Sequence, residues 1–127
     1  MERSGEVVLL REIFADRNCV GKYVRVTGYV STVNTKFNLL EITHDECSLS
    51  VDVSLVDMGS IKLDALVQFI GEIQSRPAYI QRQEQGFDQG SVTGNIILAA
   101  RVCRIVDGLD LRLYEEALRA RREFLIS

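Results

Sequence analysis

The sequence predicts an all-β barrel of five strands followed by a C-terminal α-helix. Three observations support this fold class. Five segments alternate apolar and polar residues, two of them carry a glycine near the middle, and the last twenty residues change to a helical repeat. A strand shows successive side chains to opposite faces, whereas a helix repeats every 3.6 residues, so the change of period marks the end of the barrel.

The predicted strands span residues 21–33, 36–43, 47–55, 65–75 and 95–106. In the first strand, Val24, Val26 and Val30 share one face, and Gly28 interrupts it. A glycine inside a strand indicates a sharp bend or a close backbone approach, as a closed barrel requires. The third strand alternates most clearly, with serines between its apolar residues. The apolar run 7–14 is expected to be an edge strand or a lead-in segment packed on the barrel.

The connections between the strands narrow the choice of barrel. Residues 56–63 form a connector in which a helical turn is a reasonable expectation, and 76–93 lack periodicity and predict a long loop. This order of five strands predicts an OB-fold, although alternation alone is also compatible with an SH3-like barrel or an open β-sandwich. We expect one domain, with the barrel over about 20–107 and the helix over about 110–125.

The composition excludes several classes of protein. The formal net charge is −3, whereas an autonomous nucleic-acid binder usually has a basic excess that neutralises phosphates. No apolar run approaches the ~20 residues of a membrane span, and no secretion signal is visible, so we expect an intracellular protein without a membrane partner. Cys19, Cys47 and Cys103 are odd in number and widely spaced, which favours free thiols.

The C-terminal helix is amphipathic, and Asp110 is expected to cap its first turn. One half of the helix is entirely charged: Arg112, Glu115, Glu116, Arg119, Arg122 and Glu123. The other half is apolar except for Arg121: Leu111, Leu113, Tyr114, Ala117, Leu118, Ala120, Phe124 and Leu125. Docking on a single domain needs only about 100° of apolar face, and this helix has roughly twice that. The excess predicts contact with a partner protein.

The apolar half divides into two predicted surfaces. Leu113, Ala117 and Ala120 are assigned to the barrel, because alanine lets backbones approach closely. The partner-binding residues are predicted to be Tyr114, Leu118, Arg121, Phe124 and Leu125. A buried, unpaired guanidinium is costly, so we expect Arg121 to meet a carboxylate, for which one on the partner is suitable, or to lie over an aromatic ring.

A nucleic-acid surface is weakly indicated. OB-folds bind single strands across the second and third strands by base stacking and phosphate contacts, but the outward side chains of the third strand here are serines and Asp52. Auxiliary DNA contacts are predicted for Tyr23, Arg25, Lys36, Phe37, Arg76, Tyr79 and Arg82. Ordinary surface and packing roles are an equally good interpretation of these seven residues.

No catalytic site is predicted. His44, Asp45, Glu46 and Cys47 are adjacent, but neighbouring side chains in a tight turn point apart, so a solvated hairpin is the better interpretation. The single histidine gives no metal cluster, and no glycine-rich loop has the pattern of a phosphate site. We therefore expect a protein that is not an enzyme and that has no metal or cofactor.

The end of the chain resembles the Ten subunit of the CST (Ctc–Stn–Ten) telomere complex. The likeness is carried by Gly108, Asp110, Leu111, Leu113, Glu115, Ala117, Leu118 and Arg119. Residues 21–56 are similar to the family in the order of their hydrophobic pattern.

The resemblance implies a non-catalytic OB-fold subunit paired with an Stn-like subunit and associated with a Ctc-type large subunit. Such a complex works in the nucleus at telomeres, where it binds single-stranded DNA, caps chromosome ends and assists DNA polymerase α–primase in lagging-strand fill-in. Two alternatives stay open: an assembly module like the smallest RPA subunit, and an OB-fold accessory subunit of a nucleic-acid enzyme.

Overall fold

The computed structural model describes residues 5–16, 18–57, 59, 61–75 and 96–126 of the chain. The strands are β1 (Glu6–Val7), β2 (Tyr23–Asn34), β3 (Leu39–His44), β4 (Cys47–Asp52), β5 (Leu66–Ser75) and β6 (Ile96–Ile105). The helices are α1 (Leu10–Ala15) and α3 (Leu111–Ile126). The five longer strands coincide with the five predicted ones, while the predicted loop 76–93 lies outside the described residues.

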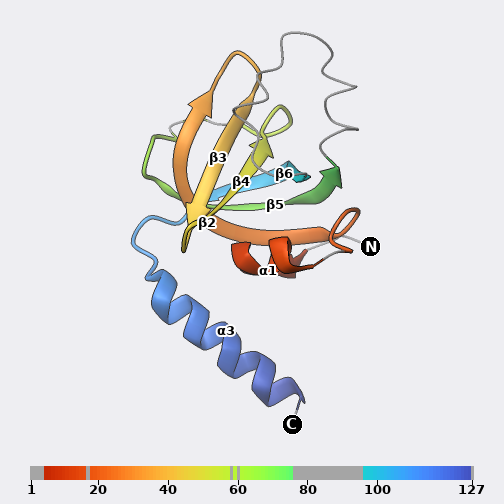
Figure 1. Ribbon diagram of the computed structural model, residues 1–127. Helices are drawn as coiled ribbons and strands as arrows, with labels where there is room; N and C mark the ends of the chain where they lie inside the picture. The colour runs from red at the N-terminus through yellow and green to blue at the C-terminus, as the bar shows by residue number, and fades with distance from the viewer. Residues whose placement is uncertain (1–4, 17, 58, 60, 76–95, 127) are drawn as a thin grey trace.

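The strands close into a barrel because β2 pairs with both β3 and β5 (Figure 1). Its first half pairs with β5 and its second half with β3, and the register shifts between Val30 and Thr32. The ring runs β2–β3–β4–β6–β5 and back to β2, with a short parallel contact between β4 and β6 at Val51 and Leu98. This topology confirms the predicted OB-fold barrel.

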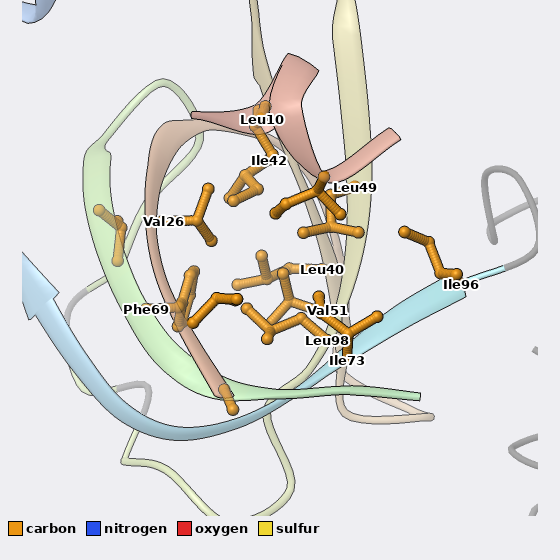
Figure 2. Packing of buried hydrophobic residues seen from close by; sticks show 14 of the residues in the cluster. Leu10, Val26, Leu40, Ile42, Leu49, Val51, Phe69, Ile73, Ile96 and Leu98 are labelled. Carbon is orange, nitrogen blue, oxygen red and sulfur yellow. The ribbon is translucent and has the colours of Figure 1, made fainter. Parts of the chain in front are cut away.

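The barrel interior is filled by the apolar face of each strand (Figure 2). Val26, Ile42 and Leu49 point inward from β2, β3 and β4, and Phe69 and Leu98 from β5 and β6. All five side chains are at most 1 % exposed. The alternation in the sequence therefore identified the core correctly.

Gly71 allows the closest backbone approach in the barrel. A Cβ atom there would lie 2.1 Å from the carbonyl oxygen of Ala99 on β6, and the register of β5 against β6 shifts between Ile70 and Gly71. At Gly28, a Cβ would lie 3.1 Å from the Cβ of Ile42. The predicted role of the two mid-strand glycines is confirmed.

The segment before the barrel contains a short helix that the sequence did not reveal. Glu6 and Val7 pair in parallel with β2, so the edge strand is only two residues long. In α1, Leu10 and Ile13 are 1 % and 3 % exposed and join the core, which confirms the lead-in interpretation. The Glu12 carboxylate accepts the Leu9 N–H (2.8 Å) and stabilises the first turn of this six-residue helix.

The connections differ from expectation in detail. Asp45 and Glu46 have φ of 50° and 65° and join β3 to β4 in a two-residue turn with both central residues left-handed. β4 ends at Asp52, three residues before the predicted end at 55. The described part of the connector between β4 and β5 forms turns and contains no helix.

All three cysteines are free. None of the described helices is long and apolar enough to cross a membrane.

Candidate partner interface on the C-terminal helix

Two aspartates order the root of α3: Asp107 bonds it to the barrel, and Asp110 caps its first turn. Asp107 Oδ1 accepts the Leu66 N–H at the start of β5 (2.7 Å), and Gly108 then turns the chain with φ +92°. Asp110 Oδ1 accepts the N–H groups of Arg112 and Leu113 (3.0 and 3.3 Å), which confirms the predicted helix cap. From this root α3 extends beyond the barrel on the side that carries α1 (Figure 1).

An arginine in the last turns of α3 holds the helix to the segment before the barrel. Arg122 Nη1 donates to Glu12 Oε2 (2.6 Å), and Nη2 donates to the carbonyl oxygen of Val7 (2.7 Å). Burial opposes ionisation of Glu12, but the hydrogen bonds from Arg122 and from the Leu9 N–H outweigh it and lower the pKa of this carboxyl. We call the contact of Arg122 with Glu12 and Val7 the Arg122 clamp.

A second polar contact lies nearer the root of the helix. The carboxylate of Glu115, 16 % exposed, pairs with Arg11 of α1, and His44 Nε2 at the end of β3 lies 3.4 Å from its other oxygen. The hydrogen bond from Arg11 is the main reason that the pKa of Glu115 is lowered, with a smaller contribution from His44. We call Glu115 with Arg11 and His44 the Glu115 clamp. The predicted solvated hairpin is therefore partly covered, because His44 contacts α3.

Part of the apolar side of α3 faces away from the barrel. Leu111, Glu115 and Arg122 turn toward it, so residues about half a turn away point outward. Leu113 is 61 % exposed and Phe124 80 %, and Ala117 and Ala120 are also exposed. The expectation that Leu113 and Ala120 cover the barrel is wrong, because the face of α3 that meets the barrel carries Leu111 and Leu118 together with Glu115 and Arg122. Ala117 is exposed but lines the hollow between the helix and the barrel.

A hollow of about 300 Å³ separates α3 from the outer surface of β2 and β5. Tyr114, Leu118 and Arg121 line it from the helix, and Arg25 and Gln68 from the strands. An adjoining hollow of about 470 Å³ shares four lining residues with the first: Val7, Arg25, Leu118 and Arg121. Among the described carboxylates, none forms an ion pair with Arg121. The hollow is therefore suited to an incoming acidic group.

The structure brings three of the five predicted partner residues together at this hollow. Tyr114 and Leu118 are half-buried there and Arg121 is exposed, while Phe124 lies on the outer side and the side chain of Leu125 lies outside the described part. The sequence analysis did not identify Gln68, and it assigned Arg25 to a DNA contact. The position of Arg25 on the outward face of β2 was the sequence feature that could have placed it in this hollow.

The four described residues that were predicted to contact DNA lie in two separate places. Tyr23 and Arg25 lie at the start of β2, while Lys36 and Phe37 lie in the turn after its end. About 35 Å of strand separates Arg25 from Lys36 at ~3.3 Å per residue. Lys36 Nζ lies 5.4 Å from the Phe37 ring centroid. Arg76, Tyr79 and Arg82 are outside the described residues.

One cluster near the root has ligand-type side chains. His44, Asp45 and Glu115 bring ligand atoms within 4.8 Å of one another. Arg11 already pairs with both carboxylates, Glu115 and Asp45. The cluster thus has an internal cation and serves to hold α3.

The barrel and the helix together define an OB-fold assembly subunit: a closed barrel whose terminal helix keeps large apolar side chains exposed, Leu113 and Phe124 among them. The sequence matches, over residues 1–127, the family described as telomere-capping, CST complex subunit. The chain belongs to this family.

Several solved structures share the fold of this chain. The Stn1–Ten1 complex of S. pombe contains a chain with a TM-score of 0.70 and 16 % identity, covering 97 % of this chain and 96 % of the other. The telomere capping protein Ten1 of the same yeast gives 0.68 and 17 %, covering 94 % and 99 %. Replication protein A of U. maydis bound to single-stranded DNA gives 0.62 and 18 %, covering 98 % and 94 %. Among curated proteins, none matches this chain.

Proposed function

We propose that this chain is a non-catalytic subunit of a CST-type complex and that it pairs with an Stn-like OB-fold subunit through α3. One observation carries the proposal: α3 is held in place by charged clamps while Leu113 and Phe124 stay 61 % and 80 % exposed. Burying such side chains in a partner contributes about 1.5–3 kcal/mol each. Family membership, and the solved complex in which Stn1 accompanies Ten1, support the choice of partner.

The interface we propose has two parts. In the hollow, Tyr114, Leu118 and Arg121 contact the partner together with Arg25, and a partner carboxylate pairs with Arg121. On the outer side of the helix, Phe124 and Leu125 contact the partner, and Leu113, Ala117 and Ala120 join them because the barrel leaves them exposed. A hydrogen-bonded arginine–carboxylate pair would orient the partner on the apolar surface.

Single-stranded DNA is expected to bind through the complex, with only auxiliary contacts from this chain. The net charge of −3 supports a minor share for this chain, as does the absence of any lysine or arginine from β4. Membership of the family supports three further parts of the proposal: association with a Ctc-type large subunit, an indirect link to polymerase α–primase, and a nuclear, telomeric location. The RPA-type alternative is supported by likeness of fold alone.

Charge reversal in the hollow tests the pairing. The chain is co-expressed with the Stn-like subunit of its own organism, and the heterodimer is quantified after affinity capture. Arg121→Glu should lower the affinity by about tenfold or more, because a like charge then faces the partner carboxylate. Arg112→Glu is the matched control, since the Arg112 side chain is 88 % exposed and its one ion pair to a described residue is with Glu116. Equal capture of both variants would refute the proposed interface.

DNA binding is tested separately with a telomeric single strand. At physiological salt the isolated chain should bind weakly and the reconstituted complex tightly, with a steeper salt dependence for the complex. Tight binding by the isolated chain would contradict the minor role proposed for it.

A further inference from the structure

One edge of β6 pairs with β5, and the opposite edge is open along the C-terminal half of the strand. β6 pairs with β5 along most of its length, but with β4 only at Leu98 and Ala99. Beyond Ala99, no other strand of the described part pairs with it. Arg101 is the extra residue of a bulge, so the regular open edge begins at Val102.

The hydrogen-bond pattern identifies the backbone groups at this edge. The Val106 N–H donates to the Leu66 carbonyl (2.8 Å), and bonded and non-bonded pairs alternate along an antiparallel ladder. Val102 and Arg104 therefore bond to β5. The N–H and C=O groups of Cys103 and Ile105 point to the open edge, where an added strand could bond to them.

The side chains along the edge indicate the chemistry of the occupant. Val102 and Ile105 are 43 % and 46 % exposed, and Arg101 and Arg104 are exposed without an ion pair to any described carboxylate. Val102 and Arg104 share the outer face of β6, and Cys103 and Ile105 the inner one. An acidic residue opposite Arg104 and apolar residues against Ile105 would complement both faces.

A second copy of this chain fits the edge poorly. Antiparallel pairing of two β6 edges would bring Arg101 and Arg104 of each copy, four like charges, onto one two-stranded ribbon. Like charges facing each other across strands are destabilising. An acidic segment of another protein does not meet this repulsion.

The geometry points to β6 as a docking edge for an extended segment that alternates acidic and apolar residues and that adds a strand beside Val102–Ile105. The surface shares no residue with the helix interface proposed for the Stn-like subunit. It provides a second attachment point, so a further protein could bind while α3 is occupied.

Amide exchange on the full-length chain tests the position of the added strand. The probe is a synthetic peptide of alternating glutamate and valine, and the control peptide has lysine in place of glutamate. With the acidic peptide, exchange at the amides of Cys103 and Ile105 should slow by about tenfold or more, while Val102 and Arg104, already bonded to β5, change little. Slowing at all four amides alike, or with the lysine peptide, would overturn the proposal.

Variants of the edge provide a second measurement by peptide anisotropy. Ile105→Pro removes an N–H that points outward and should lower peptide affinity by about tenfold, whereas Ile105→Ala keeps the N–H and should lose much less. Arg104→Glu, at an exposed side chain, should abolish binding even where the proline variant folds poorly. The proposal would be overturned by any of three results: unchanged peptide binding by Arg104→Glu, no binding by the wild type, or self-association of the chain through this edge. Capture of the Stn-like subunit should be normal in Arg104→Glu, which separates this inference from the proposed function.

Discussion

The barrel and α3 are held together by opposite kinds of contact. Inside the barrel, side chains such as Leu49 and Phe69 are fully buried, and no charge is needed to position them. On α3, Leu111 is the only buried apolar side chain among those described, and the helix is positioned by Glu115 and Arg122. The barrel is therefore stabilised by apolar side chains of its own chain. On α3, most apolar surface stays accessible, and a partner protein could bury it.

The same substitution in the two regions gives the largest expected contrast. Leu49→Ala should lower the free energy of unfolding by about 2–5 kcal/mol, because it leaves a cavity in a filled interior. Leu113→Ala, at a side chain 61 % exposed, should change it by about 0.5 kcal/mol or less. Urea denaturation of both variants measures the difference. Equal losses would mean that α3 packs on the barrel in solution.

A methyl group at Gly71 tests how tightly the barrel is closed. Gly71→Ala should cost about 1–3 kcal/mol or more, because the new Cβ meets backbone rather than a movable side chain. Gly28→Ala is the control, since its new Cβ would meet the Ile42 side chain at 3.1 Å. Thermal unfolding followed by circular dichroism should show the larger loss for Gly71→Ala. The reverse order would contradict the backbone geometry.

Removing the Arg122 clamp should loosen α3 while leaving the barrel intact. Arg122→Ala removes hydrogen bonds to Glu12 and Val7, and because both side chains of the ion pair are 37 % exposed we expect a local loss of about 1 kcal/mol. Amides in the last turns of α3 should exchange faster, and those of β2 and β5 should not. Arg119→Ala is the control. Equal effects of the two variants would show that the clamp contributes nothing.

Acid should weaken both clamps. The pKa values of Glu12 and Glu115 are lowered in the folded chain, so their stabilisation is fully present above the pKa of an unfolded carboxyl, ~4.3, and is lost as pH falls through the lower folded pKa. Glu115→Gln should therefore be less stable than the wild type at about pH 6, and the two should converge below about pH 4. Thermal unfolding across this range measures the difference, and a gap that persists at low pH would contradict the ionic origin.

The sequence predicted the barrel well because one face of each strand is buried. That burial imposes the alternation seen in β2 and β4, and the close approach at Gly71 explains a glycine within a strand. α1 was missed because six residues are too few to show a helical period. Periodicity separates the faces of a helix without saying which one meets the barrel.

The orientation of α3 depends on contacts that no local pattern records. Arg122 and Glu12 are 110 positions apart, and Glu115 and His44 are 71 apart. An arginine on the charged half of a helix is usually solvated, so its role here was invisible before the fold was known. Arg25 was singled out from the sequence, but its place beside α3 became visible only in the structure.

The root of α3 also sets how accurately its far end is placed. With 16 residues at ~1.5 Å each the helix is about 24 Å long, so a tilt of about 10° at Asp107 and Gly108 moves the far end by about 4 Å. That displacement exceeds the length of a hydrogen bond, so it would break the Arg122 contact. A change at the Asp107–Leu66 bond, far from Phe124, would thus misplace Phe124 without altering the side chain itself.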